Sequence, residues 1–335
     1  MKIIITGGHF SPAYSVLQKL KSENEVLVMG RRYAFEGERN ETYEYKICKK
    51  NNIPFLEINA GRLQRVLTKH TIASLARFPK GVYQALRILK KEKPDIVVTF
   101  GGYIGLSVAI AAHFAKVPVI LHEQTQKAGL SSRLISRFAK VVCISFDTSR
   151  PFFKNKNVVL TGNPIREEIL KDGESFFASI EKDVIYITGG STGSHAINTK
   201  IKEILPELLR DYKVYHQTGN SLEYNDYETL FEFKNSIPKE LSKNYILQQF
   251  FLPNEVSSLL HNASLVISRA GINTVSELLA IGAVSLLIPL PHGQSNEQLD
   301  NAKLFKSTGL GEYLEQKELT PKVLLAMVND MIRKQ

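Results

Sequence analysis

The sequence predicts two Rossmann-like α/β domains in tandem. The chain has 335 residues, which is enough for two domains of ordinary size. Short apolar runs rich in β-branched residues alternate with helical patterns along its whole length, which is typical of βαβ units with parallel sheets. Each half also opens alike, with an apolar strand followed by Thr-Gly-Gly at 6–8 and at 188–190.

In the first half, strands are predicted where a short apolar run ends in glycine, proline or charged residues. These strands are Lys2–Thr6, Glu25–Met29, Pro54–Ile58, Asp95–Phe100, Val117–His122 and Lys140–Ile144. Helices fill the gaps between them. The first helix is expected to have Ser11 as its N-cap and Pro12 at its first helical position. Pro79 is expected to interrupt any long helix in its neighbourhood.

The second half repeats the alternation of strands and helices. Its predicted strands are Val184–Thr188, Lys213–His216, Tyr245–Gln248, Ser264–Ile267 and Val284–Ile288. Glycine, proline and charge interrupt the pattern between Asn163 and Asp183, so the domains are assigned to residues 1–163 and 164–335. Open α/β sheets bind ligands beyond the carboxyl ends of their strands. The expected site is therefore a cleft between two facing sheets.

Composition excludes several classes of protein. The chain is 43% hydrophobic and 23% charged, as expected for a globular enzyme and not for a disordered chain. Its two cysteines, Cys48 and Cys143, form neither a disulfide framework nor a CxxC motif, which favours a reducing cytosol. The apolar stretch 105–121 is interrupted by His113 and Lys116, so it predicts no membrane-spanning helix. The first residues are too short an apolar run for a signal peptide.

Most of the net charge of +10 lies in one segment. Residues 62–93 contain nine basic residues and one acid, interleaved with apolar side chains at helical spacing. Such a surface suits anionic lipid headgroups. A nucleic-acid groove is the other use of basic charge, but no RNA-binding motif or aromatic platform accompanies it. An anionic membrane surface is therefore predicted as a partner, and nucleic acid is not.

Two glycine turns in the second half can approach a phosphate. The turns at 189–194 and 268–274 each follow a strand and precede a helix, whose N-terminal N–H groups favour anions. A tight turn needed only for packing is the alternative. Arg166 is placed to pair with a diphosphate, and Glu277 to accept hydrogen bonds from ribose hydroxyls. Their alternatives are a hinge residue and a partner of the helix dipole.

Neither a metal nor a cofactor is predicted. The chain has no HExxH motif, no Asp-x-Asp pair and no His/Cys cluster. A dinucleotide-binding dehydrogenase needs GxGxxG and an acid after its second strand. Neither half has them, although Arg31 leaves a cofactor with a 2′-phosphate open.

Seven motifs follow one another over essentially the whole chain. They are TGGHFSPA (6–13), GGYIG (101–105), HEQTQKAGLSSR (122–133), TGNPIR (161–166), GGSTGS (189–194), SRAGINTVSELLAIG (268–282) and the stretch from 297 to 302. In type and order they resemble the MurG family of UDP-N-acetylglucosamine transferases, which are two-domain glycosyltransferases of the GT-B fold. The resemblance implies metal-free, inverting transfer of N-acetylglucosamine to a lipid-linked muramoyl pentapeptide, the step from lipid I to lipid II. It also implies a cytoplasmic enzyme peripheral on the inner face of the bacterial plasma membrane.

The resemblance assigns donor roles to the second domain. Ser191 and the turn 271–274 would face the diphosphate together with Arg166. Glu277 would hold the ribose, the Phe251 backbone would read the uracil edge, and two side chains would bind sugar hydroxyls. The implied donor residues are Arg166, Ser191, Phe251, Gly271, Ile272, Asn273, Thr274, Glu277, Glu297 and Gln298.

The first domain would bind the acceptor. The implied residues on this side are Gly7, Gly8, Gly101, Gly102, Tyr103, His122, Glu123, Gln124 and Thr125. His9 is predicted to be the general base, since an imidazole with a near-neutral pKa suits proton removal from a hydroxyl. Its alternatives are a hydrogen bond to a phosphate and a helix cap. A buried structural role is the alternative for His122.

The departures from the family pattern fall mainly on the acceptor side. The first glycine loop, GGTGGH in the family, is reduced to Gly7-Gly8-His9, and Thr125 replaces the usual asparagine. No proline follows the GGY motif, and the chain ends soon after the helix predicted near Met331. Donor binding is thus predicted more directly than acceptor identity. A related transferase with another polyprenyl or sugar acceptor, or an inactive UDP-sugar-binding protein, are the alternatives.

Overall fold

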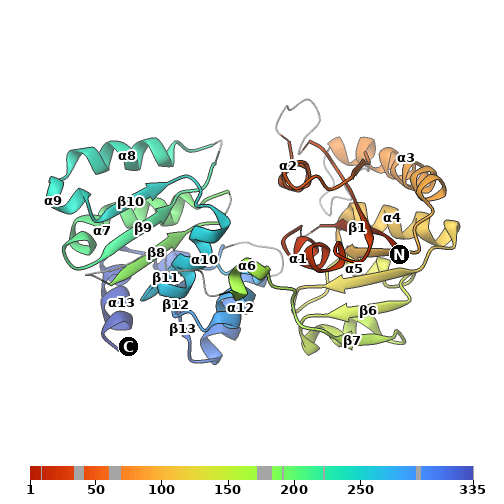
Figure 1. The fold of residues 1–335 in the computed structure, drawn as a ribbon. Helices are drawn as coiled ribbons and strands as arrows, with labels where there is room; N and C mark the ends of the chain where they lie inside the picture. Colours follow the sequence, from red (N-terminus) through yellow and green to blue (C-terminus); the bar gives the residue numbers. More distant parts are fainter. Residues whose placement is uncertain are drawn as a thin grey trace. The chain divides into compact units, whose positions relative to one another are not determined.

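The computed structural model describes residues 1–8, 10–33, 41–59, 69–171, 183–190, 192–221, 223–291 and 296–334. The chain divides into two compact units, Met1–Pro164 and Ile165–Gln335. Each unit is built on one parallel sheet with helices packed on it (Figure 1). The predicted α/β class with two Rossmann-like domains is confirmed.

The sheet of the first unit has the order β3-β2-β1-β4-β5-β6-β7, and the pairings are parallel. The strands are β1 (Lys2–Gly7), β2 (Glu25–Gly30), β3 (Phe55–Glu57), β4 (Ile96–Phe100), β5 (Val119–Glu123), β6 (Val141–Ile144) and β7 (Val158–Leu160). The helices are α1 (Phe10–Leu20), α2 (Tyr43–Lys50), α3 (Lys69–Glu92), α4 (Gly102–Ala115), α5 (Leu130–Ile135) and the 3₁₀ helix η1 (Asp147–Phe153).

Both faces of this sheet are covered, which explains the continuous apolar run of β1. Successive side chains of a strand point to opposite faces. Ile4 accordingly belongs to the core cluster that includes Leu89 of α3, whereas Ile3 and Ile5 belong to the cluster that includes Leu17 of α1. Parallel strands buried on both faces read as unbroken apolar runs.

The sheet of the second unit has the order β10-β9-β8-β11-β12-β13, again with parallel pairings. The strands are β8 (Val184–Thr188), β9 (Lys213–Gln217), β10 (Tyr245–Gln248), β11 (Leu265–Ser268), β12 (Ser285–Leu287) and β13 (Gly311–Tyr313). The helices are α6 (Glu167–Leu170), α7 (His195–Asp211), α8 (Asp226–Ser236), α9 (Lys239–Ser242), α10 (Pro253–Asn262), α11 (Ile272–Ile281), α12 (Glu297–Ser307), the 3₁₀ helix η3 (Gln316–Glu318) and α13 (Pro321–Arg333).

Two edge strands are missing from the prediction. In β7, Val159 and Leu160 are exposed at 43% and 54%. The strand has no well-buried face, so its sequence does not show the pattern by which a buried strand is predicted. The other, β13, consists of Gly-Glu-Tyr and is the edge strand beside β12. Three-residue edge strands carry too few positions for a periodic signal.

Two predictions about proline are wrong. The first helix, α1, already begins at Phe10, so Ser11 is not its N-cap. Pro12 fits there because the first N–H groups of a helix have no intrahelical acceptor. The long helix α3 runs through Pro79 without a break. Beyond the proline, Val82 and Leu89 pack into the core, and α3 lies against α4, which offsets the lost hydrogen bond.

The most apolar stretch of the sequence, 105–121, is divided between α4 and β5. Within the described ranges, no helix combines the length and the apolar character needed to cross a bilayer.

Candidate active site

Each sheet has one point where the strand order reverses, and the predicted glycine turns lie at these points. In the first unit, Gly7 ends β1 and Gly8 follows it, while Gly101 is the N-cap of α4 and Gly102 its first residue, directly after β4. In the second, Gly189-Gly190 follows β8, and Gly271 precedes α11 after β11. Open α/β sheets bind their ligands at such switch points. Each unit therefore has one candidate site at the carboxyl edge of its sheet.

The glycine turn after β8 is packed backbone to backbone against the loop after β9. A Cβ on Gly193 would lie 2.0 Å from the Thr218 carbonyl oxygen, and one on Gly219 2.2 Å from the Gly193 nitrogen. Both residues also have positive φ angles, +77° and +73°. Only glycine allows this contact. The turn leads into α7, where Ser194 is the N-cap. Ser191 lies outside the described residues.

Arg166 and Glu277, assigned to the diphosphate and the ribose, contact each other. Arg166 Nε donates to Glu277 Oε1 at 2.7 Å and Nη2 to Oε2 at 2.9 Å. Their side chains are only 23% and 10% exposed. A carboxylate oxygen has lone pairs for more than one donor, so Glu277 can still accept a ribose hydroxyl. The two predicted donor contacts are thus one coupled unit.

Gln217 connects the predicted uracil reader to the glycine turn. The Phe251 N–H donates to Gln217 Oε1 at 3.1 Å, and Gln217 Nε2 donates to Thr188 Oγ1 at 3.1 Å. Thr188 Oγ1 also accepts from the Gly190 N–H at 3.1 Å. The Phe251 ring is buried against Tyr186 and Tyr215. A base that uses the Phe251 N–H must share it with Gln217 or displace that side chain.

Sequence reasoning missed Gln217. The available signal was its position, because it ends the second strand of this unit, where a nucleotide-binding fold often places a ribose ligand.

The turn before α11 presents backbone rather than side chains. Gly271 is the N-cap of α11, and Ile272 is 4% exposed, so only its backbone can face a ligand. Asn273 and Thr274 follow in the first turn. Buried Asn301 donates from Nδ2 to the Ala270 carbonyl at 3.1 Å and fixes the turn against α12.

The two residues assigned to the sugar begin α12. Glu297 is its first residue, and Gln298 Oε1 accepts from the Leu290 N–H at 2.9 Å. Arg269 holds the chain that leads there, donating to the Ile288 carbonyl at 3.1 Å and to Gln316 Oε1 at 2.7 Å. Burial lowers the pKa of Arg269 to about 10, so the guanidinium stays charged at neutral pH. Arg269 therefore ties residues 288–289 to η3.

In the first unit the two glycine turns also meet closely. A Cβ on Gly8 would lie 2.9 Å from Gly102 Cα. Beside them is a cavity of about 160 Å³. It is lined by Gly7, Gly8, Arg31, Tyr33, Thr42, Glu44, Tyr103 and Ile104. Arg31 Nη1 donates to Tyr103 Oη at 3.1 Å. His9, the predicted base, lies outside the described residues.

Five lining residues of this cavity were not predicted as site residues, namely Arg31, Tyr33, Thr42, Glu44 and Ile104. Arg31 directly follows β2, so its place at the carboxyl edge was readable from the strand pattern. Glu44 lies in the first turn of α2, and burial raises the pKa of its carboxyl to about 7. A carboxyl that titrates near neutrality in a cavity is a candidate functional group.

The side chains of the motif 122–125 are bonded to each other and to neighbouring backbone, including that of Phe100 and Gly162. His122 Nε2 lies 3.0 Å from the Gly162 carbonyl oxygen, and burial lowers the pKa of His122, so the ring is neutral at pH 7. Glu123 Oε1 accepts from the N–H and the hydroxyl of Thr125, at 3.0 and 2.7 Å. Gln124 Nε2 donates to the His122 carbonyl at 3.1 Å. Their acceptor-side roles stay predictions.

No three His, Cys, Asp or Glu side chains gather closely enough to hold a metal ion in the part of the chain that the structure describes.

Family models match both halves of the chain. The glycosyltransferase family 28 N-terminal domain matches residues 3–144, and the C-terminal domain of that family matches residues 184–335. A relative from Clostridium perfringens (strain SM101 / Type A) is 35% identical over 341 aligned residues, covering 98% of this chain and 90% of the relative. The chain belongs to glycosyltransferase family 28. That relative is named UDP-N-acetylglucosamine--N-acetylmuramyl-(pentapeptide) pyrophosphoryl-undecaprenol N-acetylglucosamine transferase.

Other similar proteins agree with this family 28 membership. A relative of the same name from Clostridium botulinum (strain Alaska E43 / Type E3) is 35% identical over 330 residues, covering 95% of this chain and 86% of the relative. The crystal structure of Acinetobacter baumannii MurG matches with a TM-score of 0.71 and 27% identity, over 99% of this chain and 90% of that one. The predicted GT-B fold and the resemblance to the MurG family are confirmed.

We predict that Glu277→Ala weakens UDP binding by about 1–3 kcal/mol, because a charged hydrogen-bond acceptor is lost. Arg166→Ala should also weaken it. The double variant should lose less than the sum, since the two side chains contact each other. Calorimetric titration with UDP measures all three. Asp330→Ala, which breaks an exposed pair with Lys334 in the same unit, is the control. Strictly additive losses would contradict the coupling.

A second prediction concerns the pH dependence of stability. The raised pKa of Glu44 means that the folded chain binds more protons than the unfolded chain between about pH 4.5 and 7. Stability from this group is therefore greatest at low pH and falls as the pH rises through that window. Relative to Glu44→Gln, the wild type should lose about 1–3 kcal/mol across it. Urea unfolding at a series of pH values measures the difference, with exposed Glu23→Gln as control. If the stability of the wild type and of Glu44→Gln changed in parallel with pH, Glu44 would not have a raised pKa in the folded chain.

Proposed function

We propose that this chain transfers N-acetylglucosamine from UDP-N-acetylglucosamine to a lipid-linked muramoyl pentapeptide, forming lipid II from lipid I with inversion. The observation that carries the proposal is the donor site of the second unit. Two glycine turns there lie at the switch point, and Glu277 of α11 is paired with Arg166. Relatives at 35% identity over nearly the whole chain are named for this reaction, which supports it.

The donor would bind through fixed positive charge. The N-termini of α7 and α11 supply N–H groups that lack intrahelical acceptors, and Arg166 supplies a guanidinium. These groups would meet the charge that develops on the leaving UDP. Glu277 would accept from the ribose, and the Phe251 backbone would read the base.

The reaction would be a single displacement. The acceptor hydroxyl attacks the anomeric carbon opposite UDP, the new glycosidic C–O bond forms, and the bond to the UDP oxygen breaks. His9 would take the hydroxyl proton as general base. The cavity beside Gly8 and Gly102 would hold part of the acceptor, with Arg31 and Tyr103 as donors.

The acceptor would be reached at the inner face of the plasma membrane. The described part of the basic segment exposes Lys80, Arg87 and Lys90 on α3. Tyr83 of α3 and Phe114 of α4 are 62% and 67% exposed, and the two helices pack against each other. Exposed aromatic rings beside basic residues suit an anionic bilayer surface.

Turnover of labelled UDP-N-acetylglucosamine with a lipid I analogue tests the proposed reaction. The wild type should form the lipid II analogue, and His9→Ala should lower turnover about 10²–10⁴-fold, because the hydroxyl loses its base. A loss below tenfold would leave His9 a positioning role. Turnover only with other acceptors would indicate a related transferase, and UDP binding without turnover an inactive binding protein.

Flotation with vesicles of anionic lipid tests the membrane surface. Arg87→Ala/Lys90→Ala should weaken binding by about 1 kcal/mol for each charge removed. Tyr83→Ser/Phe114→Ser, added to the charge variant, should weaken vesicle binding further, because the exposed rings no longer enter the headgroup layer. Phe231→Ser, an exposed ring of the second unit, is the control for lost surface hydrophobicity. Equal binding by all variants would refute the proposed surface.

A further inference from the structure

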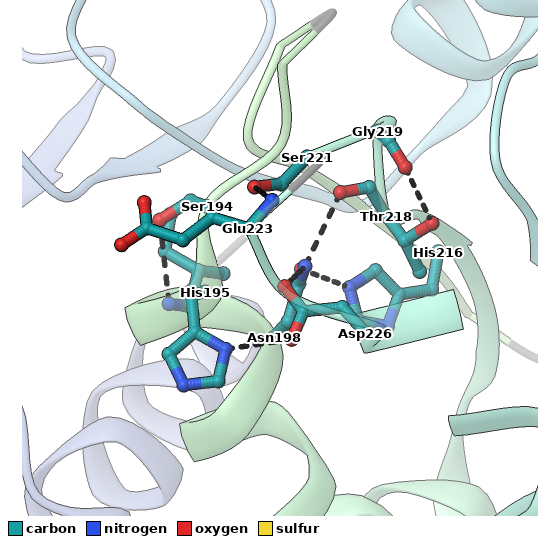
Figure 2. A network of polar contacts seen from close by, with 10 residues as sticks. Ser194, His195, Asn198, His216, Thr218, Gly219, Ser221, Glu223 and Asp226 are labelled. Atoms are coloured by element: carbon teal, nitrogen blue, oxygen red, sulfur yellow. Dashed lines mark hydrogen bonds and ion pairs between the residues drawn. The ribbon is translucent and has the colours of Figure 1, made fainter. Parts of the chain in front are cut away.

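Asn198 is the centre of a buried polar network beside the donor turn (Figure 2). It lies in the first turns of α7 and is 1% exposed. Its Nδ2 donates to the Thr218 carbonyl at 3.2 Å and to Asp226 Oδ2 at 2.8 Å. Its Oδ1 lies 3.0 Å from His216 Nε2. Both N–H bonds and the oxygen of this amide are therefore engaged.

The orientation of the Asn198 amide, which donates to two acceptors, fixes the tautomer of His216. Burial lowers the pKa of His216 to about 3, so the ring is neutral and has one N–H. Because Asn198 Oδ1 can only accept, that N–H is on Nε2. His216 Nδ1 then accepts from the Tyr245 hydroxyl at 2.9 Å. The hydrogen bonds run in one direction, from β10 through β9 to α7.

The network reaches the surface through Asp226, the first residue of α8. Its Oδ1 lies 2.6 Å from His195 Nδ1. The His195 ring is stacked on Tyr224, with centroids 3.9 Å apart and planes 8° apart. His195 is also the first residue of α7. The network thus joins the starts of two helices to the loop after β9.

The bond to Thr218 gives this network a connection to the donor site. The oxygen of the same Thr218 carbonyl lies against Gly193, at the place where a side chain on that residue would begin. The loop 218–219 is therefore the support on which the glycine turn lies, and Asn198 holds that support from α7. A glycine turn has no side chains of its own to maintain this contact.

We propose that Asn198 is a positioning residue for donor binding. By holding Thr218 and Gly219 against the glycine turn, it fixes the N–H groups that receive the diphosphate of the UDP-sugar. The proposal rests on the proposed function of the second unit, and it adds a residue that touches no substrate. Its effect should fall on the donor and not on the acceptor.

Two variants separate positioning from simple stability. N198A removes all three bonds. The double exchange N198D/D226N keeps an acceptor for His216 at position 198 and restores an amide–carboxylate bond between positions 198 and 226. It removes the donation to the Thr218 carbonyl, moves the negative charge from position 226 to position 198, and leaves an amide oxygen at 226 that can still accept from His195 Nδ1. Because two of the three bonds at position 198 are kept, its urea midpoint should lie above that of N198A, whereas its donor affinity should resemble that of N198A.

The readouts are the Kd of UDP by calorimetry, the two KM values and the urea midpoint, all with the full chain. N198A and the double exchange should each raise the Kd of UDP and the KM of UDP-N-acetylglucosamine about tenfold or more, which corresponds to about 1.4 kcal/mol. The KM of the lipid I analogue should not change. N244A is the matched control, because Asn244 also donates to a backbone carbonyl, that of Leu209 at 2.9 Å, but at the amino end of β10. It should change the midpoint alone.

Wild-type donor affinity in the double exchange, or a Kd of UDP within twofold of wild type in N198A, would overturn the positioning role alone. A wild-type chain that does not bind UDP would overturn the proposed function and the positioning role with it.

Discussion

The close approach of two glycine-containing loops is the constraint on which the donor unit depends. Gly193 and Gly219 meet at distances that exclude a Cβ. This contact brings the glycine turn onto the loop after β9, next to the start of α7. The cost is that glycine cannot anchor the turn by side-chain bonds. Amides from neighbouring elements supply the anchoring instead: Asn198 from α7 holds Thr218, and Gln217 from β9 holds Thr188.

Charge is handled differently in the two units, and the difference fits their proposed substrates. In the second unit Arg166 and Glu277 form a bidentate pair, so neither charge is buried alone before a ligand arrives. In the first unit Arg31 donates to a neutral phenol, and burial gives the nearby Glu44 a pKa of about 7. A fixed guanidinium suits a leaving diphosphate. A carboxyl that is partly protonated at neutral pH can either donate to or accept from an acceptor group.

The sequence was sufficient for the central strands and insufficient for the side-chain partners. The apolar run Ile3–Ile5 predicts β1 because both faces of that strand are buried. The edge strand β7 is largely exposed, so its sequence carries no comparable pattern. Motif spacing located Arg166 and Glu277. It did not predict that they pair, since they are 111 residues apart and local patterns do not encode such contacts. Glu44 was missed for the same reason, whereas Gln217 could have been predicted from its place at the end of β9.

Two departures from the family pattern on the acceptor side are accommodated by local contacts in this chain. Although the first glycine loop is shorter, Gly8 still packs on Gly102, so the contact between the two turns of the first unit is retained. Thr125, which replaces the usual asparagine, gives both its N–H and its hydroxyl to Glu123. Both of these bonds go to Glu123 Oε1, and Oε2 accepts from the Gly129 N–H at 3.4 Å, so Glu123 stays paired in a buried loop, where an unpaired carboxylate would be costly. A substitution that preserves the pairing of a buried charge is compatible with an intact acceptor site, and this favours an active transferase over a chain that only binds the sugar nucleotide.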